Sequence, residues 1–415
     1  MRPSATVAIN ELCNEMIREG RDIYKLGLGQ SPFPVPSSVV EKLRTHADRK
    51  DYLAVRGLTE LRSAVADYHR RRQGLTCSFE DVLVGPGSKE LMFLLQLVYY
   101  GDLVVPTPSW VSYAPQAAII GRKIVWVETD RDSGWQITPE RLEEICREDP
   151  DRPRIVVLNY PNNPTGGTYK LEELKGLADV ARRHRVILLS DEIYGELHFR
   201  GQHVSVARFY PEGTIVSGGL SKWCGAGGWR LGVFVFPPSL RWLLDAMAAV
   251  ASETFTATSA PIQYAGVRAY YGGLDIERYL WNSRRVLRAL GRWCHRTLTA
   301  AGLDVVEPRG AFYLFPDFSP LAERLAARGI RTSAQLCASL LQDTGVAILP
   351  GSEFGRPRGE LTARLAFVNF DGAQALAAAE VLPRDQALDE NFLRQACLPT
   401  ITAIERLADW TRAAV

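Results

Sequence analysis

The sequence predicts an α/β fold, in which helices cover both faces of a mostly parallel sheet and a smaller α+β domain follows. Short, nearly continuous apolar segments alternate with helical patterns through the middle of the chain, and the pattern changes after a long helical segment at residues 277–298. Apolar strands without polar alternation are typical of parallel strands that are buried on both faces. The chain of 415 residues is too long for one ordinary hydrophobic core, so we expect about two domains.

The predicted strands and helices alternate from residue 58 to residue 236. A helical stripe of apolar residues opens the series at Leu58, Leu61, Val65 and Tyr68. Short apolar runs predict strands over residues 81–84, 103–105, 123–127, 154–158, 186–189, 214–216 and 232–236. Helical patterns predict helices over residues 88–98, 138–146 and 171–184. An arginine-rich helix over residues 277–298 then leads to predicted strands at 303–306, 311–315 and 363–368 and to a C-terminal helix over 388–414.

Charge and cysteine content argue against several classes of protein. The net charge is +2 and both signs are spread along the chain, which argues against a nucleic-acid binder that works by phosphate neutralisation. The seven cysteines are scattered and form no Cys-x-x-Cys pair, so neither a disulfide framework nor a metal site is expected. The N-terminus lacks the pattern of a signal peptide, and no apolar run reaches the roughly 18 residues of a membrane span. We therefore expect a cytoplasmic protein without a membrane segment.

Polar residues follow three of the predicted strands, at the edge where an open α/β sheet binds its ligands. Residues 85–90, Gly-Pro-Gly-Ser-Lys-Glu, precede a helix whose first N–H groups can hold a phosphate, although a tight turn explains the glycines about as well. Residues 159–166, Asn-Tyr-Pro-Asn-Asn-Pro-Thr-Gly, come in an order more specific than turn chemistry requires. Asp191 follows the next strand. A carboxylate there is often a helix N-cap, but it can also hold a pyridinium nitrogen protonated.

Lys222 is the residue on which the functional hypothesis depends. It ends the segment 217–222, Ser-Gly-Gly-Leu-Ser-Lys, which follows an apolar strand, and Arg230 comes eight residues later. A lone lysine is most often a solvated surface charge. A lysine in a Gly/Ser-rich turn with an arginine nearby suggests instead an imine-forming lysine beside a phosphate site, provided that the rest of the chain supplies the other parts.

Together these motifs resemble those of the fold-type I pyridoxal phosphate (PLP) enzymes, most closely the class I and II aminotransferases. The matching segments, in order, are Asn163-Pro164-Thr165-Gly166, Asp191-Glu192-Ile193-Tyr194, Ser221-Lys222, Gly228-Trp229-Arg230, and Arg364 in a late strand. The resemblance covers residues from about 26 to about 370 and implies a mostly parallel seven-stranded sheet. We expect a large PLP-binding domain over residues 41–285, a small C-terminal domain over 286–415, and an N-terminal segment, 1–40, that packs with the small domain.

The resemblance also implies how the cofactor, pyridoxal 5'-phosphate, is bound. Lys222 corresponds to the lysine that holds it as an aldimine and later moves the proton at the substrate α-carbon. Asp191 corresponds to the partner of the pyridine nitrogen, Tyr194 and Asn163 to the residues that hydrogen-bond the ring oxygen, and Trp110 to the aromatic residue that stacks on the ring. The residues that correspond to the phosphate-binding group are Gly87, Ser88, Lys89, Ser221 and Arg230.

Other matching residues are implied to bind the substrate or the partner subunit. Arg364 corresponds to the arginine that holds the substrate α-carboxylate through two parallel hydrogen bonds. Gly29 and the loop 350–355 correspond to segments that close over the substrate, which Asn163 also contacts. Tyr52 corresponds to a tyrosine that reaches the phosphate in the partner subunit, which implies a homodimer with shared active sites.

The leading hypothesis is an aminotransferase that acts on an α-amino acid and a 2-oxo acid. Gly219 stands where many relatives have a serine that helps to hold the phosphate, and residues 223–228 are rich in glycine. Because fold and cofactor do not select the reaction, a PLP-dependent biosynthetic enzyme that catalyses replacement, elimination, cyclisation or oxidation is the alternative. A DNA-binding regulator is a weaker alternative, because about 25 residues before the first matching motif are too few for a further domain. No second arginine is placed in the side-chain pocket, so the sequence does not choose a dicarboxylic substrate.

Overall fold

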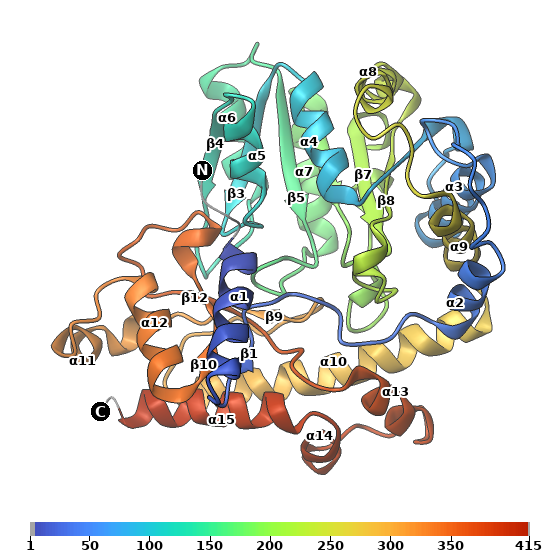
Figure 1. The fold of residues 1–415 in the computed structure, drawn as a ribbon. Coiled ribbons are helices and arrows are strands. Elements are labelled where there is room, and N and C mark those ends of the chain that lie inside the picture. Colours follow the sequence, from blue (N-terminus) through green and yellow to red (C-terminus); the bar gives the residue numbers. More distant parts are fainter. Residues whose placement is uncertain (1–4, 414–415) are drawn as a thin grey trace.

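A seven-stranded sheet dominates the upper part of the molecule in Figure 1, a computed structural model that describes residues 5–413. Its strand order is β2-β8-β7-β6-β5-β3-β4, and β8 is antiparallel to both of its neighbours while the other pairs are parallel. The strands are β2 (Val82–Gly85), β3 (Asp102–Thr107), β4 (Ile124–Glu128), β5 (Arg154–Asn159), β6 (Ile187–Asp191), β7 (Thr214–Gly219) and β8 (Gly232–Val235). The predicted α/β fold with a mostly parallel sheet of seven strands is confirmed.

Both faces of this sheet are covered by helices and lined by apolar side chains. Successive side chains of each strand point to opposite faces, so apolar positions on both sides of the central strands are buried. Val104, Val156 and Leu188 face α6 and α7, whereas Val105 and Val157 face α4 and α8. This two-sided burial explains why the strands read as continuous apolar runs. The helices of this part are α2 (Ser37–Arg44), α3 (Thr59–Gln73), α4 (Ser88–Val98), α5 (Tyr113–Ile119), α6 (Pro139–Glu148), α7 (Leu171–Arg183), α8 (Arg241–Ser252) and α9 (Ala260–Tyr271).

The lower part of Figure 1 combines short strands with helices. β11 (Leu349–Pro350), β12 (Ala363–Ala366) and β9 (Tyr313–Leu314) form an antiparallel sheet in that order. β1 (Tyr24–Lys25) pairs in parallel with β10 (Val346–Ala347). The helices here are α1 (Ala5–Arg18), α10 (Leu274–Ala300), α11 (Ala322–Ala327), α12 (Ser333–Thr344), α13 (Gly372–Glu380), α14 (Glu390–Ala396) and α15 (Leu398–Ala413). The N-terminal segment thus pairs with a strand more than 300 residues away in sequence, and the expected domain boundaries stay predictions.

Two predicted elements of the C-terminal part are wrong. Residues 303–306 form no strand, because only Asp304 makes an isolated bridge and the chain then turns so that Arg309 and Gly310 donate hydrogen bonds to the Gly166 carbonyl. The helix predicted over 388–414 is interrupted at Cys397, between α14 and α15. Pro399 lies in the first turn of α15, where its missing N–H is tolerated, whereas in a continuous helix it would remove the hydrogen bond to the carbonyl of residue 395 and its ring would clash with that carbonyl. Residue 414 lies outside the described part of the chain.

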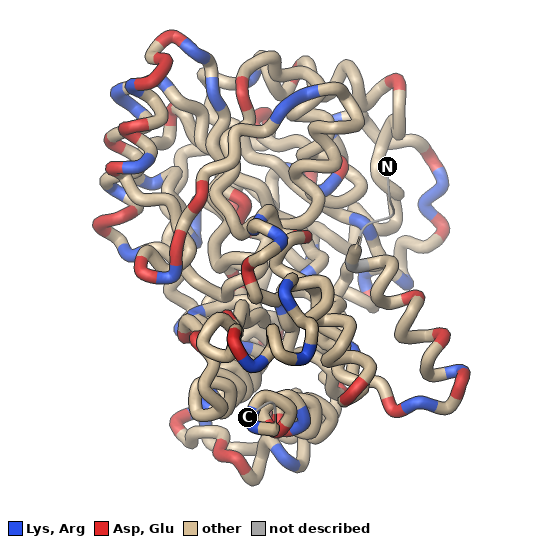
Figure 2. The backbone as a smooth tube through the Cα atoms, turned by 90° about the vertical axis from the view of Figure 1, so that its left-hand side faces the viewer, with Lys and Arg blue, Asp and Glu red and all other residues tan. Residues whose placement is uncertain are grey.

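Charged side chains are distributed over the molecule without a single-sign region on the face shown in Figure 2, where Lys/Arg and Asp/Glu segments alternate along the tube. Within residues 5–413, no helix is long and apolar enough to cross a membrane. The same residues contain no group of three or more His, Cys, Asp or Glu side chains that could hold a metal ion.

Candidate functional site

A cavity of about 630 Å³ lies at the carboxyl ends of β5, β6 and β7, where they face β9 and β12. Ligands of open α/β sheets bind at this edge, and a volume of this size fits a small organic ligand. Its polar lining contains four cationic side chains and one acidic side chain: Lys89, Lys222, Arg230, Arg364 and Asp191. The excess of positive charge fits a ligand that carries several anionic groups.

Lys222 enters this cavity from the loop that follows β7. Its Nζ donates a 2.6 Å hydrogen bond to the Gly29 carbonyl and lies 5.6 Å from the centre of the Tyr194 ring. Burial, together with the positive charges of Arg364 and Arg230, lowers the pKa of Lys222 to about 8. A neutral amine is therefore much more accessible than for a surface lysine, as a nucleophilic lysine requires.

Asp191 lies at the end of β6 and is 4% exposed. Its Oδ2 accepts a 2.7 Å hydrogen bond from the Tyr113 hydroxyl, and its Oδ1 lies 3.4 Å from the Ser217 hydroxyl. Burial raises the pKa of Asp191 to about 6, although these hydrogen bonds act in the opposite direction. No basic side chain of residues 5–413 forms an ion pair with it. A cationic N–H group of a ligand would supply the missing partner.

An anion cradle lies where the first turn of α4 approaches β8 and Arg230. The N–H groups of Ser88 and Lys89 open the helix and have no intrahelical acceptor. Gly87 has φ +94°, and a Cβ there would lie 2.2 Å from the Arg230 guanidinium. Arg230 donates to the carbonyls of Gly227 at 2.9 Å and Pro86 at 3.4 Å, which leaves further N–H groups for an anion. The donors and the absence of room for a side chain fit a phosphate group.

Arg364 is 2% exposed and lies in the middle of β12. It donates to Asn163 Oδ1 at 3.3 Å and to the Gly27 carbonyl, while its buried Nε has no acceptor among residues 5–413. Among the described acidic side chains, none pairs with this guanidinium. Because an unpaired buried charge is costly, the site needs an anionic ligand here. A carboxylate matches the planar guanidinium in shape and charge.

Tyr194 and Tyr313 form the wall between Lys222 and Arg364. Their hydroxyl groups lie 2.7 Å apart and the ring of Tyr313 lies 5.0 Å from the Arg364 guanidinium carbon. Gly29 passes so close to Tyr313 that a Cβ would lie 2.0 Å from its hydroxyl. Close approach of the N-terminal segment therefore requires glycine at position 29.

The structure brings most of the predicted site residues together. The cavity is lined by the following predicted residues: Gly29, Ser88, Lys89, Trp110, Asn163, Asp191, Tyr194, Ser221, Lys222, Arg230 and Arg364. Gly87 lies beside it, against Arg230. Tyr52 does not reach the cavity within one chain and is 90% exposed.

The glycine-rich segment after Lys222 has two different surroundings. Gly227 and Gly228 line the cavity, whereas a Cβ on Gly225 would lie 2.3 Å from the Phe33 carbonyl. Gly219 pairs with Gly232 at the end of β7, where a Cβ would lie 2.8 Å from the Leu231 carbonyl. Close backbone approach thus accounts for glycine at positions 219 and 225.

A model of the family described as "Aminotransferase class I and II" matches residues 21–382. Aspartate aminotransferase of Geobacillus stearothermophilus is 34% identical over 368 residues, which cover 86% of this chain and 90% of that protein. Aspartate/prephenate aminotransferase of Thermus thermophilus is 35% identical over 359 residues, which cover 85% and 89%. The solved structure of aspartate aminotransferase from Thermus thermophilus with maleate superposes with a TM-score of 0.83 at 31% identity, covering 99% of this chain and 97% of that one.

The chain belongs to the class I and II aminotransferases. Enzymes of this family use pyridoxal phosphate, and the predicted aminotransferase activity and fold type I architecture are confirmed. The cradle beside Arg230 fits the phosphate, while Asp191 and Arg364, which form no ion pair within residues 5–413, fit the ring nitrogen and a substrate carboxylate.

Two residues of this aminotransferase site were missed from the sequence. Tyr113 follows Trp110 by three residues, one helical turn later, and that spacing could have placed both at one end of α5. Tyr313 lies in the apolar run 311–315, in which successive side chains of a strand point to opposite faces. That alternation could have indicated that the Tyr313 hydroxyl group points toward the site. Neither carries a motif of its own, so the signal was weak.

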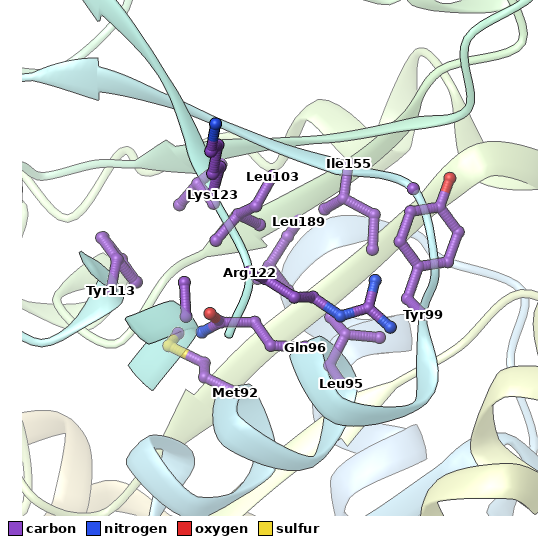
Figure 3. A pocket seen from close by; sticks show the side chains of 13 residues that line it. Met92, Leu95, Gln96, Tyr99, Leu103, Tyr113, Arg122, Lys123, Ile155 and Leu189 are labelled. Atoms are coloured by element: carbon purple, nitrogen blue, oxygen red, sulfur yellow. The ribbon is translucent and has the colours of Figure 1, made fainter. Parts of the chain in front are cut away.

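Tyr113 also lines a second, smaller pocket between α4, α5 and the sheet (Figure 3). Met92, Leu95 and Ile155 form its apolar wall, with Arg122 in the same pocket. Because the Tyr113 hydroxyl donates to Asp191, the packing of this pocket supports the position of that carboxylate.

Proposed function

We propose that this aminotransferase binds pyridoxal 5'-phosphate covalently at Lys222 and transfers the amino group of an α-amino acid to a 2-oxo acid. The observation that carries the proposal is the lysine with a lowered pKa inside a cavity that also holds an unpaired buried carboxylate and an unpaired buried arginine. When bound, pyridoxal phosphate supplies an aldehyde that condenses with amines and a ring that accepts the electron pair left at the substrate α-carbon.

Each protein group then has a position suited to one task. Asp191 would hold the pyridine nitrogen in its protonated form, because a buried carboxylate gains from pairing with a cation. Tyr194 and Asn163 would donate to the ring oxygen, and Trp110 would cover one face of the ring. Gly87, Ser88, Lys89, Ser221 and Arg230 would hold the phosphate by backbone, hydroxyl and cationic groups.

Arg364 would orient the substrate. A carboxylate held by its guanidinium would direct the substrate α-hydrogen toward Lys222, whose neutral amine would take up that proton and later donate it to the cofactor carbon. Gly29 contributes its backbone, which lets the N-terminal segment pass close to Tyr313 at the cavity. Asn163 links the two functions, since its side-chain oxygen accepts from Arg364.

Aspartate and other four-carbon dicarboxylates are the first substrates to test. The relatives are named for aspartate or for aspartate and prephenate, and a solved relative was determined with maleate, which is a dicarboxylate. The four cationic side chains of the cavity are already assigned to the imine, the phosphate and the α-carboxylate, so this choice of substrate rests on the names of the relatives.

We further propose a homodimer with shared sites, in the cytoplasm. Tyr52 is 90% exposed and lies outside the cavity of its own chain, so a shared site would require it to reach the phosphate of a second copy.

The test is a pair of half-reactions with the purified, cofactor-loaded protein. Addition of aspartate should convert the bound cofactor to its amine form with loss of visible absorbance and release of oxaloacetate, and 2-oxoglutarate should restore the absorbance. The Lys222→Ala variant is the control and should catalyse neither half-reaction. Release of a substitution, elimination or cyclisation product in place of the 2-oxo acid would refute transamination, and failure with aspartate but success with another donor would refute the substrate assignment alone.

A further inference from the structure

Arg356 is a buried arginine outside the cavity whose contacts join two distant segments. Its side chain is 7% exposed and lies just after the 3-10 helix η8 (Gly351–Phe354). The guanidinium donates to both carboxylate oxygens of Glu360, at 2.8 and 2.7 Å. It also lies 5.0 Å from the centre of the Trp135 ring. This bidentate ion pair and the aromatic contact fix the plane of the guanidinium.

The same guanidinium reaches the carboxyl ends of β3 and β4. Its Nη1 donates to the Thr107 hydroxyl at 3.1 Å and to the Thr129 carbonyl at 2.9 Å, with the Thr107 carbonyl at 3.4 Å. Thr107 is the last residue of β3, and Thr129 directly follows β4. One side chain therefore attaches the segment after η8 to the sheet edge that forms the cavity.

The backbone around Arg356 shows that this attachment is close. Gly355 has φ +86°, and a Cβ there would lie 2.9 Å from Thr107 Cγ2 and 3.0 Å from the Trp126 ring. The Ser109 N–H donates to the Phe354 carbonyl at 2.9 Å. A side chain at position 355 would push the segment away from β3, so glycine permits the contact that Arg356 then holds.

Phe354 transmits this attachment to the substrate-binding arginine. It is 1% exposed, and its ring centre lies 5.0 Å from the Arg364 guanidinium carbon, the same distance as the ring of Tyr313. Arg364 donates to the Gly27 carbonyl and, at 3.3 Å, to Asn163 Oδ1, but its Nε has no acceptor among residues 5–413, so polar contacts hold only part of the guanidinium. The two aromatic rings add to its orientation by packing against it.

We propose that Arg356 is a positioning residue for substrate carboxylate binding: it holds η8 against β3 and β4, so that Phe354 keeps the Arg364 guanidinium aligned. The inference rests on the proposed function, since it assigns Arg364 to the substrate carboxylate. It adds a residue that contacts neither cofactor nor substrate. Losing Arg356 should weaken the binding of substrate carboxylates and change the rate of the chemical steps at the cofactor only slightly.

The experiment compares Arg356→Met with Arg356→Lys, and with Arg358→Met as a matched control. Met keeps the apolar stem and removes every donor, Lys keeps the charge, and Arg358 lies two residues further in the same segment with an exposed side chain. For Arg356→Met we expect the KM for both the amino acid and the 2-oxo acid to rise about 10-fold with kcat changed less than about 3-fold, because orientation errors of this kind weaken binding of the carboxylate. Arg356→Lys should recover part of the loss, and Arg358→Met should match the wild type.

A second measurement separates this role from a general loss of structure. The half-reaction is repeated with an alkylamine that lacks the α-carboxylate, at a temperature well below the melting temperature of each variant. The preference for the amino acid over the alkylamine should fall about 10-fold in Arg356→Met while the alkylamine rate stays constant. Equal loss with both donors, or an unchanged KM in the folded variant, would overturn the role of Arg356. A wild-type protein that converts no amino acid would instead overturn the proposed function.

Discussion

The lowered pKa of Lys222 makes a quantitative prediction about how the cofactor attaches. Attachment requires the neutral amine, so its rate should follow the fraction of Lys222 that is deprotonated. With a pKa of about 8, about one tenth of the amine is neutral at pH 7, compared with roughly one part in 3,000 for an ordinary lysine. The cavity should therefore accelerate attachment at pH 7 about 300-fold through protonation state alone. The rate should rise with pH up to about 8 and level off above it.

The perturbation that tests the cause is Arg364→Gln. Burial is the largest cause of the lowered pKa of Lys222, and the positive charge of Arg364 is the next. Removing that charge stabilises the protonated amine, so the pKa of Lys222 should rise. The pH above which the attachment rate levels off should then be higher than in the wild type.

The assay is the appearance of visible absorbance after cofactor-free protein is mixed with pyridoxal phosphate across a pH series. N-acetyl-lysine amide in the same buffers is the control, because it reports the titration of the cofactor itself. A plateau that appears only near pH 10 in the wild type would refute the buried, low-pKa lysine. An Arg364→Gln variant that binds cofactor but keeps the wild-type plateau would show that burial alone sets the pKa.

Three further predictions follow from single contacts. Tyr113→Phe removes a 2.7 Å hydrogen bond to the buried carboxylate of Asp191; a loss of about 1.5–3 kcal/mol should slow the first half-reaction about 10- to 100-fold, measured by stopped-flow absorbance. If the sites are shared, mixing inactive Lys222→Ala with a weakened Tyr52→Ala variant and exchanging subunits should recover activity above either parent, and no recovery would contradict sharing. Burial raises the pKa of the Cys224 thiol, which is fully buried, so iodoacetamide should modify Cys224 only in unfolded protein, as peptide mass spectrometry would show.

The large sheet could be predicted from the sequence because burial on both faces leaves a local signal. Every strand of that sheet contains a short apolar run, and the predicted bounds agree with the observed strands to within two residues, except that β7 continues three residues beyond the predicted run 214–216. The small strands carry no such signal. β1 and β10 have two residues each and depend on a partner more than 300 residues away, which no local pattern reveals.

The site was predictable to the extent that its residues belong to ordered motifs after strands. Lys222 and Asp191 were found after strands, Arg364 was matched within a late strand through the family resemblance, and the structure brings the three to one cavity. Tyr113 and Tyr313 were not, because their positions are defined by contacts across the fold with Asp191 and Tyr194. Tyrosines in apolar segments are ordinarily core residues, and only the tertiary structure shows which hydroxyl groups face a site.

Two adjacent acidic residues, Asp191 and Glu192, differ in whether the fold supplies a partner for their charge. Glu192 also has a buried side chain, yet it accepts hydrogen bonds from Ser190 and Ser205 and pairs with His203 at 2.8 Å. Burial alone would raise the pKa of Glu192, but His203 and the hydroxyl groups hold it below its usual value. Within residues 5–413 no cationic side chain forms an ion pair with Asp191, and its pKa is raised to about 6. A fold selected only for stability would pair or replace such a charge, because breaking a buried ion pair is costly. The missing partner of Asp191 is therefore best understood as a ligand, and the same reasoning applies to Arg364.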